Sequence, residues 1–409
     1  MRVLLSTYGS RGDVEPMVAL AAALEALGAE AVVSAPGDAD FVALCERAGV
    51  QLAPAFMPVR EWIASAQRNP GSIEEYGRRM IGAQYAAIDA AADGCDVVVA
   101  TGLMPSVGAA QCVAETRGLR YEHATFCPLF LPSEHHRPFP YPGHPHPEGV
   151  TDSKILWDIN AGAMKALFAG NINRQRQAVG LQPVDNIREH VFTRQPLLAS
   201  DPVLWPWQPT VLSEPLQTGA WILPDERPLP EDLEAFLDEG PAPVYVGFGS
   251  IAVQEPREAA RVAAEAARAN GRRLVLQKGW AELALADDGD DCFVVGEVNQ
   301  QMLFPRMAAV VHHGGAGTTT TAARAGTPQV VVPQIVDQPF WAARVAGLGI
   351  GVAHEGSKPT VESLTSALRT ALTPEVGARA EAVAASMPGD GAMVAARHLL
   401  QSPGARSAL

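Results

Sequence analysis

The sequence has few cysteines and no pattern among them. The five cysteines are odd in number, are scattered along 409 residues and never form a CxxC pair. Such usage excludes a disulfide framework and a cysteine-based zinc site, and it predicts reduced thiols. Apolar runs of about 18 residues are also missing, so we expect no transmembrane helix. Because polar residues follow the short run Met1–Thr7, no signal peptide is expected either, and the expected location is cytoplasmic.

Positive charge is scarce as well. A net charge of -14 at pH 7 argues against nucleic acid and anionic membranes as partners. The chain contains no GxGxxG dinucleotide fingerprint, no GxxxxGK[ST] phosphate loop and no GxSxG, HExxH or kinase motif. These absences argue against a dinucleotide or ATP as the ligand. A monomer or weak dimer is the expected assembly.

Short apolar segments alternate with alanine-rich helical segments along the chain. The first half shows this pattern in the expected strands 1–7, 31–36, 95–102 and 121–126, with a helix over 15–30. The second half repeats it in strands 243–250, 272–279, 292–298, 308–315 and 328–334, with helices over 256–271 and 318–326. Such alternation is typical of parallel βαβ units, and the length favours two domains.

The expected domains follow from the composition between the two halves. We place an N-terminal Rossmann-like domain at 1–205, a linker rich in proline and tryptophan at 206–225 and a second such domain at 226–380. The segment 381–409 is helical in pattern but has no strand to follow, so we expect it to pack back on the first domain. Ligands of such folds bind beyond the carboxyl ends of the strands.

The strongest local pattern is VVHHGGAGTTTTAARAG, residues 310–326. A strand ends at His312 and His313, a glycine turn follows, and a helix is expected to start near Thr318. Glycines let the backbone approach a ligand closely, and a helix N-terminus attracts anions. The pattern favours a diphosphate site, although a glycine turn without a ligand is the structural alternative.

Several segments resemble one enzyme family. Residues 312–353 look like the donor-binding motif of GT-B glycosyltransferases, and GSRGDVEP at 9–16 resembles their acceptor-side turn. More specific likeness to the glycopeptide-antibiotic aglycone glycosyltransferases lies in 149–162, 176–184, 195–204 and 217–237. The resemblance covers nearly the whole chain and weakens over 55–85 and 128–148. It implies two Rossmann-like domains facing across a cleft.

The same resemblance implies the reaction. A hexose would move with inversion from a UDP- or dTDP-sugar to a hydroxyl group of a glycopeptide aglycone. The nucleotide sugar is a co-substrate, and no cofactor or metal is implied. Asp13 takes the position of the general base, although an ordinary N-cap of a helix starting near Val14 is the other reading.

Further site residues come from the resemblance. Ser10, Arg11 and Gly12 are expected to reach the donor phosphate or sugar, unless Arg11 is only a surface charge. The remaining donor-binding residues implied are Ser250, Trp280, Glu297, Val298, His312, His313, Gly314, Gly315, Ala316, Gly317, Thr318, Asp337 and Gln338. Within this set, Trp280 either stacks on the nucleobase or packs, and Asp337 and Gln338 either bind sugar hydroxyls or form a solvated turn.

Alternatives remain open at this stage. The acidic turn at 287–292 is interpreted as a turn rather than a metal site. The histidine- and proline-rich stretch with His135, His136, His144 and His146 is interpreted as a mobile loop over the acceptor rather than a zinc site. The same chemistry on a sterol, macrolide or aromatic polyketide is the second hypothesis. A nucleotide-sugar epimerase and a non-catalytic donor-binding partner are the others.

Overall fold

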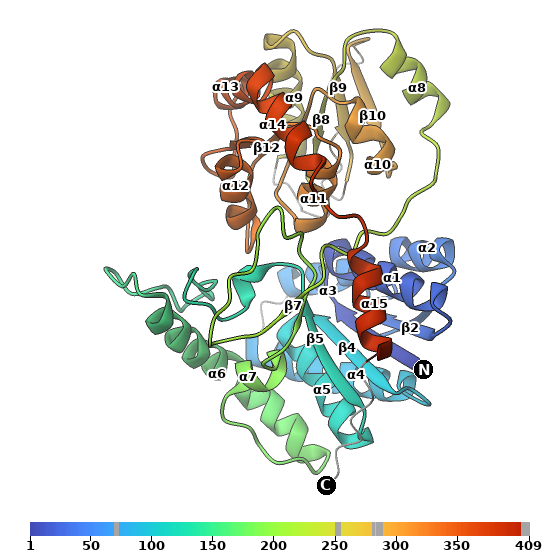
Figure 1. Ribbon diagram of the computed structural model, residues 1–409, viewed down its shortest axis with the longest axis vertical. Coiled ribbons are helices and arrows are strands. Elements are labelled where there is room, and N and C mark those ends of the chain that lie inside the picture. Colours follow the sequence, from blue (N-terminus) through green and yellow to red (C-terminus); the bar gives the residue numbers. More distant parts are fainter. Residues whose placement is uncertain (69–72, 250–254, 280–282, 284–288, 402–409) are drawn as a thin grey trace. The chain divides into compact units, whose positions relative to one another are not determined.

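The computed structural model describes residues 1–68, 73–249, 255–279, 283 and 289–401. The chain divides into two compact units (Figure 1). Unit 1 consists of Met1–Ser200, Trp207–Leu223 and Gly389–Leu409, and unit 2 of Asp201–Pro206 and Pro224–Pro388.

Unit 1 is built on a parallel sheet in the order β3-β2-β1-β4-β5-β6-β7. Its strands are β1 (Arg2–Tyr8), β2 (Glu30–Ala35), β3 (Gln51–Pro54), β4 (Val97–Gly102), β5 (Arg120–Thr125), β6 (Leu197–Leu198) and β7 (Leu216–Gln217). The strand order reverses between β1 and β4, where Tyr8 pairs with Gly102. Ligands of open parallel sheets bind at such a reversal, beyond the carboxyl ends of the strands.

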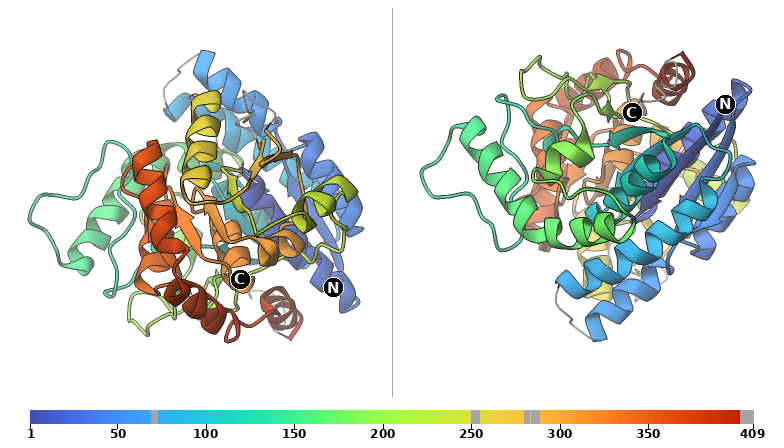
Figure 2. Two further views of the ribbon diagram at one scale, coloured as in Figure 1. Left: turned by 90° about the horizontal axis from the view of Figure 1, so that it is seen from above. Right: turned by 90° about the horizontal axis from the view of Figure 1, so that it is seen from below.

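Helices cover both faces of this sheet (Figure 1, Figure 2). Leu4 and Val98 share a core with side chains of α4, α5 and α6 on one face. The alternate residue Leu5 is buried on the other face, where α1 packs against β1 and β2 and also contacts α2 and α15. The helices of unit 1 are α1 (Arg11–Ala26), α2 (Ala39–Ala48), α3 (Val59–Arg68), α4 (Ile73–Ala91), α5 (Met104–Arg117), η1 (Pro128–Phe130), α6 (Ser153–Ala178), α7 (Ile187–Phe192) and α15 (Gly391–Gln401).

An ion-pair cluster joins α5, α6 and α7. The carboxylate of Glu115 accepts hydrogen bonds of 2.6 and 3.0 Å from Arg176, and His190 Nε2 lies 3.0 Å from the same group. Burial raises the pKa of Glu115, but the bonds from His190 and Arg176 outweigh it and lower the pKa to about 2. A single carboxylate thus links three helices that also share the hydrophobic core on this face.

Unit 2 has a second parallel sheet, in the order β10-β9-β8-β11-β12-β13. Its strands are β8 (Val244–Gly247), β9 (Leu274–Gln277), β10 (Cys292–Val295), β11 (Ala309–His312), β12 (Gln329–Val331) and β13 (Gly351–Ala353). The order reverses between β8 and β11, where Gly247 pairs with His312. This reversal places the glycine turn after β11 beside the loop after β8.

The helices of unit 2 also lie on both faces. Val244 and Val246 of β8 pack with α9 and α13, whereas Tyr245 points to the core shared by α8 and α11. The helices are α8 (Glu231–Asp238), α9 (Pro256–Ala269), α10 (Gln300–Leu303), η2 (Phe304–Arg306), α11 (Ala316–Arg324), α12 (Gln338–Gly347), α13 (Val361–Ala371) and α14 (Pro374–Ala384). Both sheets therefore have the doubly wound, Rossmann-like arrangement that the sequence predicts.

The unit boundaries differ from the expected ones at the linker. Residues 207–223 belong to unit 1 because β7 pairs with β6 and the buried Trp221 ring meets Phe126 edge-on, with 5.8 Å between ring centres. Asp201–Pro206, expected partly in the first domain, belongs to unit 2.

The last helix, α15, returns to unit 1, as expected. It begins at Gly391, and α14, which ends at Ala384 within the expected segment 381–409, belongs to unit 2. Helix α15 packs on α1, and Arg120 Nη1 donates to Leu399 O at 3.0 Å. At its first residue, a Cβ on Gly391 would lie 2.5 Å from Ala220 O, so two backbones meet there directly. Within the described residues, no helix has both the length and the apolar character needed to cross a bilayer.

Candidate functional site

Two predicted site segments of unit 2 meet where β8 and β11 end. A Cβ on Gly249, in the loop after β8, would lie 3.1 Å from Cε1 of His313. A Cβ on Gly279, after β9, would lie 2.7 Å from Gly249 O. Both glycines have positive φ, so the approach of these loops depends on residues without a side chain.

His312 is a structural residue in this arrangement. It is fully buried, and its Nδ1 accepts the Gly314 N–H at 3.1 Å. Nε2 therefore carries the proton and donates to Gln329 Oε1 at 2.9 Å. Burial and the neighbouring His313 lower the pKa of His312 to about 3, so the ring is neutral. Because both ring nitrogens serve the fold, the geometry contradicts the expectation that His312 holds the diphosphate.

His313 has the surroundings expected of a ligand-binding residue. Its ring is partly exposed and lies against the start of α11, where a Cβ on Gly315 would be 2.6 Å from Nε2. Nδ1 has no hydrogen-bond partner among the described residues. Burial lowers the pKa of His313 to about 4, so at neutral pH the imidazole is uncharged and has one N–H to donate.

The turn after His313 exposes the start of α11. This helix begins at Ala316, slightly before the expected Thr318, with Gly315 as its N-cap. The N–H groups of Ala316, Gly317 and Thr318 belong to its first turn and so have no partners within the helix. They form a row of donors beside His313, at the positive end of the helix dipole.

Gly314 brings the starts of α11 and α12 together. Its φ is +94°, and a Cβ there would lie 2.7 Å from Val331 Cγ1 and 3.2 Å from Gln338 O. Any other residue would push α12 away from the turn. The sequence-predicted His313, Gly314 and Gln338 are therefore neighbours in unit 2.

The loop before α12 is held tightly. Asp337 Oδ2 accepts the Trp341 indole N–H at 3.0 Å; burial raises the pKa of Asp337 to about 6, and this bond partly offsets the rise. Gln338 Oε1 accepts the N–H groups of Gln334 and Ile335, at 2.8 and 3.0 Å. The Gln338 oxygen therefore serves the loop, not a ligand. Val336 has a φ of +56°, a strained value for a β-branched residue.

The loop after β10 contains the next two predicted residues. Glu297 is exposed and pairs with Arg227 at 3.1 Å, whereas the Val298 side chain is buried in the core. Asn299 was not predicted as a site residue. Its Nδ2 donates to Asp225 O at 2.7 Å and to Arg227 O at 2.8 Å, and its Oδ1 caps α10. Its place before a short helix was the available signal, since asparagine favours N-caps.

Two predicted residues, Ser250 and Trp280, lie outside the described residues. A depression of about 720 Å³ lies at the start of α9 and is lined by Glu255, Pro256, Arg257 and Glu258. These residues follow Ser250 in the sequence.

In unit 1, the turn after β1 is closed by a capping box. Ser10 is the N-cap of α1, and Asp13 Oδ2 accepts its N–H at 2.8 Å and its hydroxyl at 3.3 Å. The helix thus begins at Arg11, not near Val14, and Asp13 supports it from the third helical position. A Cβ on Gly9 would lie 2.1 Å from Asp13 Oδ2, so only glycine leaves room for this carboxyl group.

Arg11 and Gly12 occupy the first turn of α1. Arg11 Nε donates to Glu15 Oε2 at 2.6 Å, one turn along the helix, which matches the surface-charge reading of this residue. Gly12 is exposed, and a Cβ on it would meet only Ser10 Oγ, at 3.6 Å.

The histidine- and proline-rich stretch is fastened to unit 1. His136 Nε2 lies 3.1 Å from Leu131 O, and the indole of Trp157 donates to His136 O at 3.1 Å. His135 Nε2 lies 3.0 Å from Pro209 O. Among the residues that the structure describes, no group of three histidine, cysteine or acidic residues has the geometry of a metal site.

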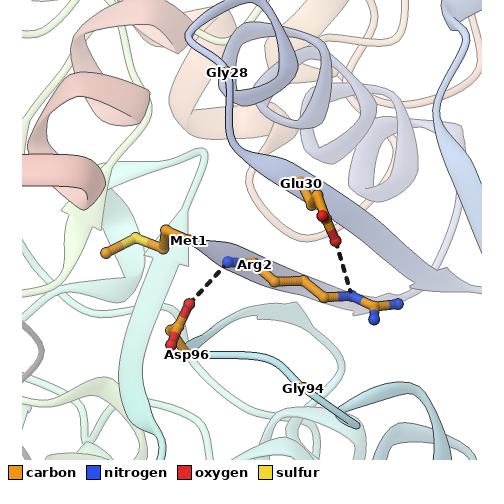
Figure 3. A pocket seen from close by; sticks show the side chains of 6 residues that line it. All are labelled: Met1, Arg2, Gly28, Glu30, Gly94 and Asp96. Carbon is orange, nitrogen blue, oxygen red and sulfur yellow. Dashed lines mark hydrogen bonds and ion pairs between the residues drawn. The ribbon is translucent and has the colours of Figure 1, made fainter.

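A second cavity, of about 320 Å³, lies at the amino ends of β1, β2 and β4. Figure 3 shows Arg2 between two acids: its N–H donates to Asp96 Oδ2 at 2.9 Å, and its Nε lies 3.9 Å from Glu30 Oε2. The predicted site residues follow the carboxyl ends of strands, so this cavity is not part of the candidate site.

Comparison with known proteins assigns the family. The protein-family model described as erythromycin biosynthesis protein CIII-like, C-terminal domain, matches residues 282–392. Glycosyltransferase GtfE of Amycolatopsis orientalis is 53% identical and covers 99% of this chain and 98% of its own. The vancomycin aglycone glucosyltransferase of the same organism is 50% identical over 98% of each chain.

Solved structures support the fold. The glycosyltransferase of kitacinnamycin aligns with a TM-score of 0.72 at 20% identity, over 98% of each chain. Spinosyn rhamnosyltransferase SpnG, complexed with thymidine diphosphate, aligns with a TM-score of 0.67 at 19% identity, over 98% of this chain and 100% of its own. The GT-B fold expected from the sequence is thus confirmed. Together with the high identities above, it shows that the chain belongs to the family of vancomycin-type aglycone glycosyltransferases.

Proposed function

We propose that this chain is an inverting hexosyltransferase that moves a sugar from a UDP- or dTDP-sugar to a hydroxyl group of a glycopeptide aglycone. The observation that carries the proposal is the 50% identity, over 98% of each chain, to the vancomycin aglycone glucosyltransferase. That relative is named for glucose transfer to a glycopeptide aglycone.

Asp13 is the proposed general base. The Ser10 N–H orients its carboxyl group at the carboxyl end of β1, beside the strand-order reversal of the first sheet. In the reaction the carboxylate takes the proton of the acceptor hydroxyl while the hydroxyl oxygen attacks the anomeric carbon. A carboxylate accepts several hydrogen bonds, so the helix-capping bond and the basic role are compatible.

The start of α11 and His313 are proposed to hold the diphosphate. As the bond between the anomeric carbon and the leaving oxygen breaks, negative charge develops on the diphosphate. The first-turn N–H groups of Ala316, Gly317 and Thr318 and the neutral imidazole are donors to that charge. These donors supply the stabilisation without a metal ion.

The start of α12 is proposed to contact the sugar. The Asp337 carboxylate accepts hydrogen bonds from hydroxyl groups, which suits a glucose-like hexose better than a deoxy sugar. The loop after β10, with Glu297 and Val298, is proposed to face the nucleobase. A relative named dTDP-epi-vancosaminyltransferase is 46% identical, so both nucleotides belong in the test.

The proposal is tested by mass spectrometry of reaction products. The protein is incubated with a glycopeptide aglycone and a panel of UDP- and dTDP-hexoses in EDTA, and Asp13→Asn is run in parallel. Asparagine keeps an oxygen for the Ser10 N–H, so α1 keeps its cap while the base is lost. A hexose-sized mass gain that disappears in Asp13→Asn supports the proposal, and full activity of the variant refutes the base.

A macrolide acceptor is the second candidate. A relative named O-mycaminosyltylonolide 6-deoxyallosyltransferase is 33% identical over 94% of each chain. Nucleotide release with a macrolide, but not with a glycopeptide aglycone, would favour this candidate. A changed sugar in the absence of any acceptor would instead indicate an epimerase.

A further inference from the structure

A short segment of unit 2 is separated in sequence from the rest of that unit. Asp201–Pro206, here called the hook, belongs to unit 2, whereas the chain on both sides of it belongs to unit 1. The hook is an ordered turn. Asp201 is fully buried, its Oδ1 accepts the Val203 N–H at 2.9 Å, and its carbonyl accepts the Trp205 N–H at 3.0 Å.

The hook is fastened to one face of α12. Arg344 Nε donates to Leu204 O at 2.9 Å, and its guanidinium carbon lies 4.8 Å from the ring centre of Trp205. Trp205 also meets Phe340 edge-on, with 5.0 Å between ring centres. Phe340 and Arg344 are four residues apart, so they lie on the same side of the helix and both face the hook.

The hook also contacts the end of α11. Arg324 is the last residue of that helix, and its Nη2 lies 3.8 Å from Asp201 Oδ2. The hook therefore touches both helices whose first residues form the candidate donor site.

A continuous set of contacts joins the hook to Asp337. Phe340 packs against the buried Trp341, with 5.1 Å between ring centres. The Trp341 indole in turn donates to Asp337 Oδ2 at 3.0 Å. Two ring contacts and one hydrogen bond thus lie between Trp205 and the carboxylate.

We propose that the hook is a positioning element of the donor site, with Trp205 holding α12 so that Asp337 meets the sugar. The inference rests on the proposed function, in which the start of α12 contacts the sugar. The nucleotide and its diphosphate would be held elsewhere in unit 2, by the turn after β11 and the loop after β10. Loss of the hook contact should therefore weaken binding of a nucleotide sugar and not of the nucleoside diphosphate alone.

The test compares two dissociation constants by calorimetry, one for UDP-glucose and one for UDP, with dTDP-glucose and dTDP as a second pair. The pair that the wild-type protein binds more tightly is used. For Trp205→Ala we expect the dissociation constant of the nucleotide sugar, divided by that of the nucleoside diphosphate, to rise about tenfold. This is the effect of one misplaced hydrogen bond to a charged group. Trp205→Phe, which keeps a ring against Phe340, should have a ratio close to that of the wild-type protein. In turnover, the Michaelis constant for the donor should rise more than the Michaelis constant for the acceptor.

Matched variants make the outcomes distinct. Trp207→Ala removes the same side chain two residues on, in unit 1, and should leave the ratio unchanged. Asp337→Asn reports on the sugar contact itself: an unchanged ratio would overturn the proposed sugar subsite. A raised ratio in Asp337→Asn with an unchanged ratio in Trp205→Ala would overturn the hook inference alone. If Trp205→Ala does not fold, Arg344→Met, which loses the bond to Leu204 O, is measured by the same ratio and decides in the same way.

Discussion

Gly9 offers a direct test of the turn after β1. An alanine there would place Cβ 2.1 Å from Oδ2 and 2.5 Å from Cγ of Asp13. The carboxyl group is the movable partner in this clash, so it would rotate away from the Ser10 N–H while the strand and helix stay in place. Gly9→Ala should therefore displace the proposed base without changing its chemistry.

The expected size of the two effects differs greatly. Loss of a helix cap costs about 0.5–2 kcal/mol. A loss of 1 kcal/mol lowers the unfolding temperature by roughly 2–4 °C in a domain of this size. Displacing a general base lowers kcat by a factor of about 10²–10⁴. Gly9→Ala should thus remain folded at 25 °C and lose most of its turnover.

The assay measures kcat with saturating donor and acceptor, together with thermal unfolding by circular dichroism. Gly12→Ala is the control for stability, because its Cβ meets only Ser10 Oγ at 3.6 Å and alanine favours a helix. The double variant with Gly9→Ala and Asp13→Asn should have nearly the same kcat as Asp13→Asn alone, because both substitutions remove the function of the same base. Wild-type kcat in Gly9→Ala would refute the reasoning.

Three further predictions use other parts of the structure. The pKa of Glu115 is lowered to about 2 in the folded state, so its contribution to the free energy of unfolding is present above pH 4.5 and is lost as the pH falls toward 2. It should amount to about 1–2 kcal/mol after allowance for partial exposure, and urea titrations should show a flatter pH profile for Glu115→Gln. His312→Ala should lower the free energy of unfolding by about 1–3 kcal/mol because it leaves Gln329 unpaired. His313→Ala should instead mainly raise the dissociation constant for the nucleoside diphosphate. The opposite pair of results would make His313 the structural residue and His312 the ligand-binding residue. Burial raises the pKa of Asp337 to about 6, so kcat/KM for the donor should fall as the pH drops below 6, and Asp337→Asn should abolish that inflection.

The sequence predicted the long, regular elements better than the short ones. The runs that became β1, β4, β8 and β11 are mostly apolar, because both faces of a parallel strand are buried. By contrast β6 and β7 have only two residues each, too few for any periodic signal. Neither was expected as a strand, and β7 lies within the segment that was interpreted as a linker. Only tertiary pairing makes them strands.

The candidate site shows a similar division. Glycine spacing predicted the turn around Gly314, because glycine is the residue that adopts positive φ and permits close backbone approach without steric cost. The separate roles of His312 and His313 could not be predicted, since adjacent strand residues look equivalent until burial distinguishes the two faces. Likewise, the bonds of Gln338 to its own loop depend on a backbone path that one sequence does not reveal.

The contact of Gly391 with the backbone at Gly219 and Ala220 has a consequence for building hybrid enzymes. A single crossover near residue 224 would exchange unit 2 except for the hook and would also bring a foreign α15, which must then settle on α1 of the other parent. A hybrid of that kind keeps its first unit intact only if the incoming helix also starts with glycine and fits that surface. Recombination among relatives should succeed more often with a second crossover near residue 389, where the chain re-enters unit 1.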